Sequence, residues 1–213
     1  MRLDDLITRL SRDTSRPQPV SRAFLLALAL GGVVSALLFT LGLGMRPDAA
    51  DAFRAPHVAM KPVLGLLAGL GCIRPALTCA RPGAAMRMRG SELPLALLPV
   101  AAALLLGLEL QRLAGGERWS AFVGESLPVF LVAMPLLSLP FLVAALVALR
   151  HGACTMPVLT GGIAGMLGGG FGVALYALFC TEDSALFFVP WYLAGMALMT
   201  GVGAALGPAA LRW

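Results

Sequence analysis

Six long runs of apolar residues, separated by short polar segments, dominate this 213-residue chain. Each run is close to the roughly 20 residues that an α-helix needs to cross a bilayer. The predicted spans are Phe24–Met45, Pro56–Ile73, Leu93–Leu110, Leu127–Leu149, Met156–Cys180 and Ala185–Leu206. The pattern predicts an all-α membrane protein, with a bundle of six transmembrane helices in residues 23–213 and an N-terminal arm in residues 1–22.

The composition excludes most soluble classes of protein. Hydrophobic residues make up 59% of the chain and charged residues 13%, and the mean hydropathy is +0.87. A water-soluble globule would lack the polar surface to cover such a core, and a disordered chain would be far more polar. The connections are too short for a separate catalytic domain, and no HExxH, GxSxG, Walker or CxxC pattern is present, so we do not expect an enzyme.

Glycines crowd the fifth apolar run. Small residues let helix backbones approach closely in a membrane, so this run is predicted to be the central packing helix. The glycines concerned are Gly161, Gly162, Gly165, Gly168, Gly169, Gly170 and Gly172.

The distribution of Lys and Arg predicts the orientation. With the N-terminus in the cytoplasm, the cytoplasmic segments hold Arg2, Arg9, Arg12, Arg16, Arg22, Arg74, Arg81, Arg87, Arg89, Arg150 and Arg212. The outer segments hold only Arg46, Arg54, Lys61, Arg112 and Arg118. This asymmetry follows the positive-inside rule, so both termini are predicted to be cytoplasmic at a bacterial inner membrane. The net charge of +5 then reflects topology, and we expect no direct contact with nucleic acid.

The N-terminal arm contains one short amphipathic helix. Leu3, Leu6, Ile7 and Leu10 form an apolar stripe at helical spacing, and Asp4 and Asp5 lie in the first turn, where the helix dipole favours acidic residues. So short a helix needs a surface to bind. That surface is either the lipid headgroup region or an apolar groove of a cytoplasmic protein, and the acidic residues favour the protein.

Cys180 is the candidate sensor. It is predicted at the outer end of the fifth span, where a thiolate can bind a soft metal ion such as copper(I), with His57 and Met60 as companions. The nearby carboxylates of Glu182 and Asp183 are expected to raise the thiol pKa. The alternative is that Cys180 is a small buried apolar residue.

The other notable residues have structural interpretations. Lys61 is expected to extend its ammonium outward to water, and Glu109 to be solvated at a span end. Cys72 and Cys79 lie roughly 10 Å apart along a helix, too far for a disulfide with each other. These two cysteines and Cys154 are interpreted as structural. An aromatic belt at the membrane surface accounts for Trp119, Trp191, Tyr192 and Trp213.

Several short segments, in order along the chain, carry a resemblance to a known family. They are Asp4-Asp5-Leu6-Ile7-x-x-Leu10, Leu43–Asp48, Lys61, Leu137–Pro140, Tyr176–Cys180, Trp191–Met196 and Leu211-Arg212-Trp213. With them the chain resembles the NrsF-type (negative regulator of sigma F) multi-pass membrane anti-sigma factors.

The resemblance implies a function. The cytoplasmic N-terminal helix would hold an extracytoplasmic-function sigma factor, and a metal or oxidative signal would release it. The family is thought to sense through two outer cysteines. Cys180 matches the second, whereas Phe130 stands where the first would fall. The alternatives are a small membrane transporter or channel, which the absence of buried acidic chains and of a repeat disfavours, and a thiol-dependent membrane oxidoreductase, which would need an outer CxxC.

Overall fold

The computed structural model describes residues 20–81, 93–112 and 118–212, and this part of the chain is helical without any strand. The long helices are α2 (Val20–Gly42), α4 (Pro56–Cys79), α6 (Leu93–Arg112), α8 (Leu127–Leu149), α9 (Pro157–Tyr176) and α10 (Ala185–Ala210). Two short helices, α3 (Ala49–Ala52) and α7 (Arg118–Val123), lie in the connections. The all-α prediction is confirmed. The N-terminal arm residues Leu3, Asp4, Asp5, Leu6, Ile7 and Leu10 lie outside the described residues.

Each of the six predicted spans overlaps a long helix, although several boundaries differ, and two of these differences change where cysteines lie. The prediction ended the second span at Ile73 because proline follows, but α4 continues through Pro75 to Cys79. Transmembrane helices tolerate such prolines because neighbouring helices satisfy the backbone groups that a proline leaves unpaired. The fifth span was extended to Cys180, whereas α9 ends at Tyr176, so Cys180 lies in the loop before α10.

By length and composition, five stretches among the described residues are suited to crossing a membrane. They are Val20–Gly42, Pro56–Cys79, Arg118–Leu149, Pro157–Tyr176 and Ala185–Ala210. The remaining predicted span corresponds to α6, which has 20 residues. Large apolar side chains such as Leu30 and Val132, 67% and 70% exposed, cover the outside of the bundle, as expected for a surface that faces lipid.

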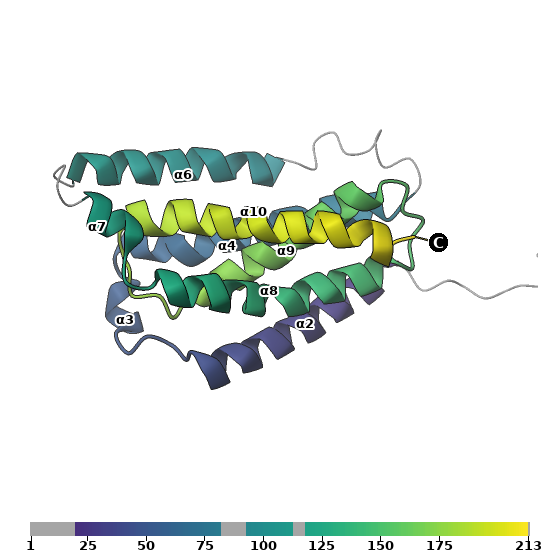
Figure 1. The fold of residues 1–213 in the computed structure, drawn as a ribbon, viewed down its shortest axis with the longest axis horizontal. Coiled ribbons are helices and arrows are strands. Elements are labelled where there is room, and N and C mark those ends of the chain that lie inside the picture. Colours follow the sequence, from purple (N-terminus) through teal and green to yellow (C-terminus); the bar gives the residue numbers. More distant parts are fainter. Residues whose placement is uncertain (1–19, 82–92, 113–117, 213) are drawn as a thin grey trace, which may run out of the picture.

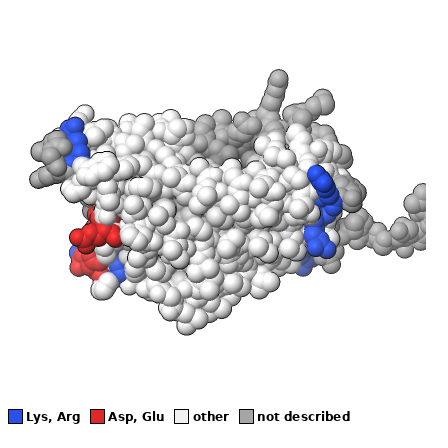
Figure 2. All heavy atoms as spheres, in the orientation of Figure 1, with Lys and Arg blue, Asp and Glu red and all other residues white. Residues whose placement is uncertain are grey.

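The long helices run alternately up and down, so successive connections lie at opposite ends of the bundle (Figure 1). The purple start of α2 and the yellow end of α10 lie at one end, and α3 and α7 lie at the other (Figure 1). All described acidic residues lie at the end that carries α3 and α7, which we call the acidic end (Figure 2): Asp48, Asp51, Glu109, Glu125, Glu182 and Asp183. The opposite end, called the basic end, carries the exposed residues Arg22, Arg74, Arg81, Arg150 and Arg212.

Helix α9 is the centre of the bundle, as its glycines predicted. It packs against α10, α4 and α8. A methyl group on Gly161 or Gly165 would meet the α10 backbone at Gly203 or Met199, and one on Gly170 would meet the α4 backbone at Gly69. Backbone-to-backbone packing of this kind depends on residues without side chains.

We expect Gly165→Ala to destabilise the bundle by about 2 kcal/mol, because the new methyl group would overlap the Met199 carbonyl and the α9 and α10 backbones would have to separate. Thermal unfolding of the detergent-solubilised protein, followed by circular dichroism, measures the change. Gly201→Ala on α10 is the matched control, since a methyl group there meets nothing within 4 Å. Equal unfolding temperatures for the two variants would contradict this packing.

Helix α2 is the most peripheral of the long helices that could span a membrane. Only 28% of the most apolar stretch of α2 is buried inside the protein, compared with 67% for α9. Its buried positions form one stripe, Phe24, Leu28, Gly31, Ser35 and Phe39, which packs mainly on α8. Within this contact the Ser35 hydroxyl donates to the Leu137 carbonyl at 2.9 Å. Helix α2 is therefore attached to the bundle along a single side.

Candidate functional site

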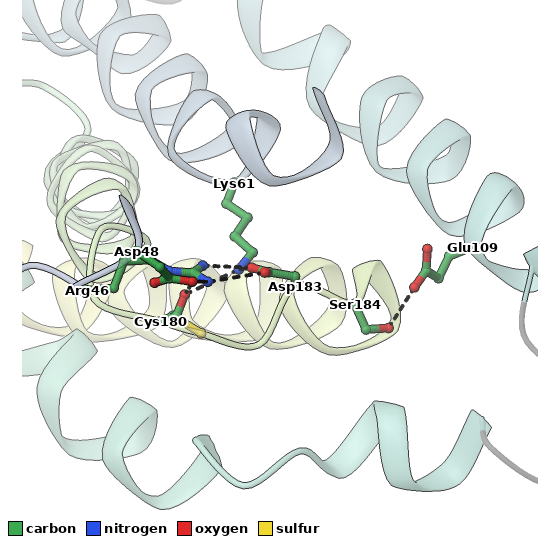
Figure 3. A network of polar contacts seen from close by, with 7 residues as sticks. All are labelled: Arg46, Asp48, Lys61, Glu109, Cys180, Asp183 and Ser184. Carbon is green, nitrogen blue, oxygen red and sulfur yellow. Dashed lines mark hydrogen bonds and ion pairs between the residues drawn. The ribbon is translucent and has the colours of Figure 1, made fainter. Parts of the chain in front are cut away.

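A network of charged side chains, whose two cations are buried, lies at the acidic end, where three separate segments of the chain meet (Figure 3). Arg46 comes from the loop between α2 and α3, Lys61 from the second turn of α4, and Asp183 from the loop between α9 and α10. The Lys61 side chain is fully buried and that of Arg46 is 4% exposed. Two cations and the carboxylates of Asp48 and Asp183 make the network neutral.

Arg46 connects two carboxylates. Its Nε and Nη2 donate to the two oxygens of Asp48 at 2.7 and 2.8 Å, a bidentate pair. Its Nη1 donates to Asp183 Oδ1 at 2.8 Å and to the Cys180 carbonyl at 3.2 Å. Arg46 therefore fastens the end of α2 to the loop that follows α9.

Lys61 reaches the same carboxylate from the opposite side. Its Nζ donates to Asp183 Oδ1 at 2.6 Å and to the Cys180 carbonyl at 3.3 Å, and it lies 5.7 Å from the ring centre of Phe188. The expectation that Lys61 extends outward to water is wrong. Its ammonium instead turns inward, because Asp183 and the Cys180 carbonyl offer it acceptors inside the protein.

The two cations stabilise the ionised carboxylates. Burial by itself raises the pKa of Asp183, but the hydrogen bonds from Arg46 and Lys61 outweigh this effect, so the pKa is lowered. The hydrogen bond from Arg46 likewise lowers the pKa of Asp48. In turn, Asp48 and Asp183 raise the pKa of Arg46. Arg46, Asp48 and Asp183 are therefore charged at neutral pH.

The loop Thr181–Ser184 also contacts the remaining connections of the acidic end. Glu182 accepts a hydrogen bond from the backbone amide of Glu125 at 2.8 Å, which ties the loop to the start of α8. The Ser184 hydroxyl donates to Glu109 on α6 at 3.0 Å (Figure 3). Glu109 is half-buried and bonded to this loop, whereas we had expected it to be solvated. Loop 181–184 thus joins α2, α4, α6 and α8 at one point.

Cys180 lies directly behind this network, and its side chain is fully buried. Burial raises the pKa of its thiol, an effect that Lys61 partly offsets and that the charge of Glu182 increases, as predicted for Glu182. The thiol lies beside the hydroxyl of Tyr192. It is therefore protonated at neutral pH, and a reagent or metal ion reaches it only if the loop moves.

Aromatic rings enclose the thiol from the side of the bundle. Phe130 stacks on Tyr192 with ring centres 5.7 Å apart and meets Tyr176 edge-on at 5.2 Å. Tyr192 is fully buried, so it does not belong to a belt at the membrane surface as predicted. Its hydroxyl has no hydrogen-bond partner among the described residues. Phe130, which stands where the resemblance implies a first outer cysteine, therefore packs against the two tyrosines that lie beside Cys180.

The proposed metal ligands come from the acidic end of the bundle. His57 and Met60 lie in the first turns of α4, at the same end as Cys180, and both are half-buried. Within the described residues, no group of three or more His, Cys, Asp or Glu side chains is placed to hold a metal ion. Copper binding by Cys180, His57 and Met60 stays a prediction.

Sequence reasoning did not identify Arg46 and Asp183 as partners of Lys61. A signal was present, since Lys61 lies within an apolar run, and a cation buried there must be paired with an acidic residue. Segments that carry the family resemblance also converge here: Leu43–Asp48, Lys61, Tyr176–Cys180 and Trp191–Met196.

Comparison with known proteins agrees with the resemblance. The family described as negative regulator of sigma F (NrsF) matches residues 10–213. The probable anti-sigma-F factor NrsF of Azospira oryzae is 33% identical over 218 residues, and the anti-sigma-F factor NrsF of Caulobacter vibrioides is 33% identical over 224 residues. Both alignments cover the full length of both chains. No solved structure matches the chain. Because the family match extends from residue 10 to the C-terminus, the protein belongs to the NrsF family of negative regulators of sigma F.

Proposed function

We propose that this protein is a membrane-bound anti-sigma factor that holds an extracytoplasmic-function sigma factor through its N-terminal helix. The observation that carries the proposal is the full-length match to two anti-sigma-F factors, with no segment of either chain left uncovered. The apolar stripe Leu3, Leu6, Ile7 and Leu10 supplies the binding surface, and Asp4 and Asp5 favour a protein partner over anionic lipid.

The charges of the two ends support a cytoplasmic N-terminus at the inner membrane. The five described Arg residues of the basic end are exposed, and no described acidic residue lies there. Helix α2 starts at the basic end, so the N-terminal arm is joined to the bundle on this side (Figure 1). In the whole sequence, the segments assigned to this side hold eleven Arg residues and the outer segments hold five Arg or Lys residues, and such a surplus is typical of the cytoplasmic side.

Helix α2 provides a physical connection between the charge network and the arm. Its 23 residues are about 35 Å long, enough to span the hydrocarbon core. One end carries the sigma-binding arm and the other leads to Arg46, which is bonded to Asp183 and the Cys180 carbonyl. A change at loop 181–184 thus alters the anchorage of α2, and the state with a displaced α2 binds the sigma factor less tightly.

The release signal in this proposal is a soft metal ion or an oxidant that reaches Cys180. Either would convert the neutral buried thiol into a charged or larger group, which the surrounding Phe130, Tyr176 and Tyr192 rings do not accommodate. The loop would then separate from Arg46 and Lys61.

Purification of the full-length protein in detergent tests the proposed partner. A sigma factor is expected to elute with the intact chain and to be absent from the eluate of the variant that lacks residues 1–16. Before extraction, the intact chain and the variant should both be inserted in the membrane. Equal recovery of a sigma factor with the deletion variant would contradict sequestration by the arm.

We expect Cys180→Ser to raise the concentration of copper or peroxide needed for half-maximal release by about tenfold or more, because a hydroxyl binds soft metals poorly and does not undergo thiol oxidation. A reporter of the sigma factor's genes gives the dose curve. Cys72→Ser is the matched control, since Cys72 is equally buried but lies in the part of α4 that leads to the basic end. Identical dose curves for Cys180→Ser and the unmodified protein would exclude Cys180 as the sensor.

A further inference from the structure

Two of the cysteines interpreted as structural converge at the basic end of the bundle. Cys79 is the last residue of α4, and Cys154 lies in the loop between α8 and α9, 75 positions further along the chain (154 − 79). Cys79 is 1% exposed and Cys154 7% exposed. Neither takes part in the charge network, which lies at the acidic end.

A single hydroxyl group brings the two thiols together. Thr160, on the first turn of α9, is fully buried and donates its only hydroxyl proton to the Met156 carbonyl at 2.8 Å. Its oxygen can then only accept further hydrogen bonds. Cys154 Sγ lies 2.9 Å from this oxygen, so the Cys154 thiol is the donor. Cys79 lies close enough to the Thr160 hydroxyl and to Cys154 to interact with both.

The backbone holds the two segments in register. The Ala153 amide donates to the Ala80 carbonyl at 2.9 Å, so the residues adjacent to the two cysteines are bonded to each other. A methyl group on Gly152 would meet the Ala80 carbonyl oxygen, which means that the loop packs directly on the end of α4. Two cysteines on segments packed this closely can join through side-chain rotation with little backbone movement.

We propose that Cys79 and Cys154 form a redox-active dithiol pair that closes to a disulfide on two-electron oxidation. Two S–H bonds break and one S–S bond forms. The two electrons and two protons pass to a peroxide oxidant, whose O–O bond breaks to give two water molecules. A disulfide is neutral, as its buried and otherwise apolar surroundings require, whereas a monovalent metal ion held by two thiolates would leave an uncompensated negative charge.

The proposal is independent of sigma-factor binding, because the pair is defined by the fold alone. The closed disulfide would link the end of α4 to the start of α9 at the end of the bundle from which α2 begins. It would therefore lock the basic end without touching the buried network around Arg46 and Lys61.

Thiol counting on the full-length protein in detergent tests the pair. The protein is treated with hydrogen peroxide, denatured and labelled with a polyethylene glycol maleimide, which resolves the number of remaining thiols on a gel. All chains in this test carry Cys180→Ser, so that oxidation of the proposed sensor thiol does not change the count. Three cysteines then remain, and we expect two of them to be lost and to return with dithiothreitol. Peptide mapping should find Cys79 joined to Cys154.

Variants make the test specific. Added to this background, Cys79→Ser and Cys154→Ser should each keep both remaining thiols, whereas Cys72→Ser should lose both. Thr160→Val, which keeps the side-chain volume, should slow closure about fivefold because the hydroxyl between the two thiols is gone. Retention of all three thiols, a link to Cys72, a link between two copies, or a loss that dithiothreitol does not restore would each overturn the proposal.

Discussion

Replacing both Leu6 and Leu10 by glutamate is expected to release the sigma factor and to switch on the genes that it transcribes. Burial of a leucine side chain contributes about 2 kcal/mol, so the loss of two contributes about 4 kcal/mol, which corresponds to roughly 1,000-fold weaker binding. Placing two carboxylates in an apolar groove adds a further cost. Co-elution of the sigma factor and a reporter gene both measure the effect.

A matched control separates the apolar stripe from charge in general. Thr8→Glu adds a negative charge on the opposite face of the same predicted helix and should leave sigma binding nearly unchanged. If the reporter stays silent in the Leu6 and Leu10 double variant while that protein remains in the membrane, the arm does not hold the sigma factor. Adsorption of the arm peptide to liposomes, without sigma binding, would identify lipid as its partner.

The second large effect is expected from Asp183→Ala, which removes the carboxylate shared by Arg46 and Lys61. Both cations would remain buried, and Lys61 would keep only the Cys180 carbonyl and the ring of Phe188. Breaking a buried ion pair costs about 3–5 kcal/mol, and we expect about 3 kcal/mol here because water already reaches part of Asp183. Thermal unfolding in detergent measures the loss, and the anchorage of α2 should weaken with it.

Asp51→Ala is the control for Asp183→Ala. Asp51 pairs with Arg54 at 3.1 Å at the same end, but their side chains are 80% and 81% exposed. Exposed pairs contribute about 0–1 kcal/mol, so this variant should unfold close to the unmodified protein. Adding Lys61→Met to Asp183→Ala should recover part of the loss by removing one uncompensated cation. Equal losses in Asp51→Ala and Asp183→Ala would show that the buried network does not stabilise the fold.

Acid should have the same effect as the Asp183 substitution. The pKa of Asp183 is lower in the folded protein than in the unfolded chain, where an aspartate titrates near about 3.9. Its contribution to stability is therefore complete above that value and is lost as the pH falls through the lowered pKa of the folded state. At neutral pH the network therefore stays intact.

The sequence was sufficient to predict the helices and the central position of α9. The length of an apolar run predicts a transmembrane helix, and seven glycines in one run predict close helix packing. Both predictions need only a short segment of the sequence. Helix ends were less certain. Pro75 is a helix breaker in water, yet it lies within α4, where it is buried among neighbouring helices.

The two buried sites depend on contacts that periodicity does not encode. Arg46 and Asp183 are 137 positions apart, and Lys61 and Asp183 are 122 positions apart. The sequence alone could not show whether Lys61 turns inward or extends toward water. An ammonium near a helix end is stabilised either by acceptors inside the protein or by water. The proximity of Cys79 to Cys154 was missed for the same reason, because only spacing along one helix was considered.

The contrast between α2 and α9 determines which parts of the bundle can transmit motion. Glycines of α9 lie directly against the α10 backbone, so this pair has little room to move. Helix α2 rests on α8 along one side, and the segment after it is held by the Arg46 guanidinium and by the hydrogen bond from the Arg46 amide to the Leu178 carbonyl. Loss of these Arg46 contacts would let α2 tilt or rotate, while the rest of the protein keeps its shape.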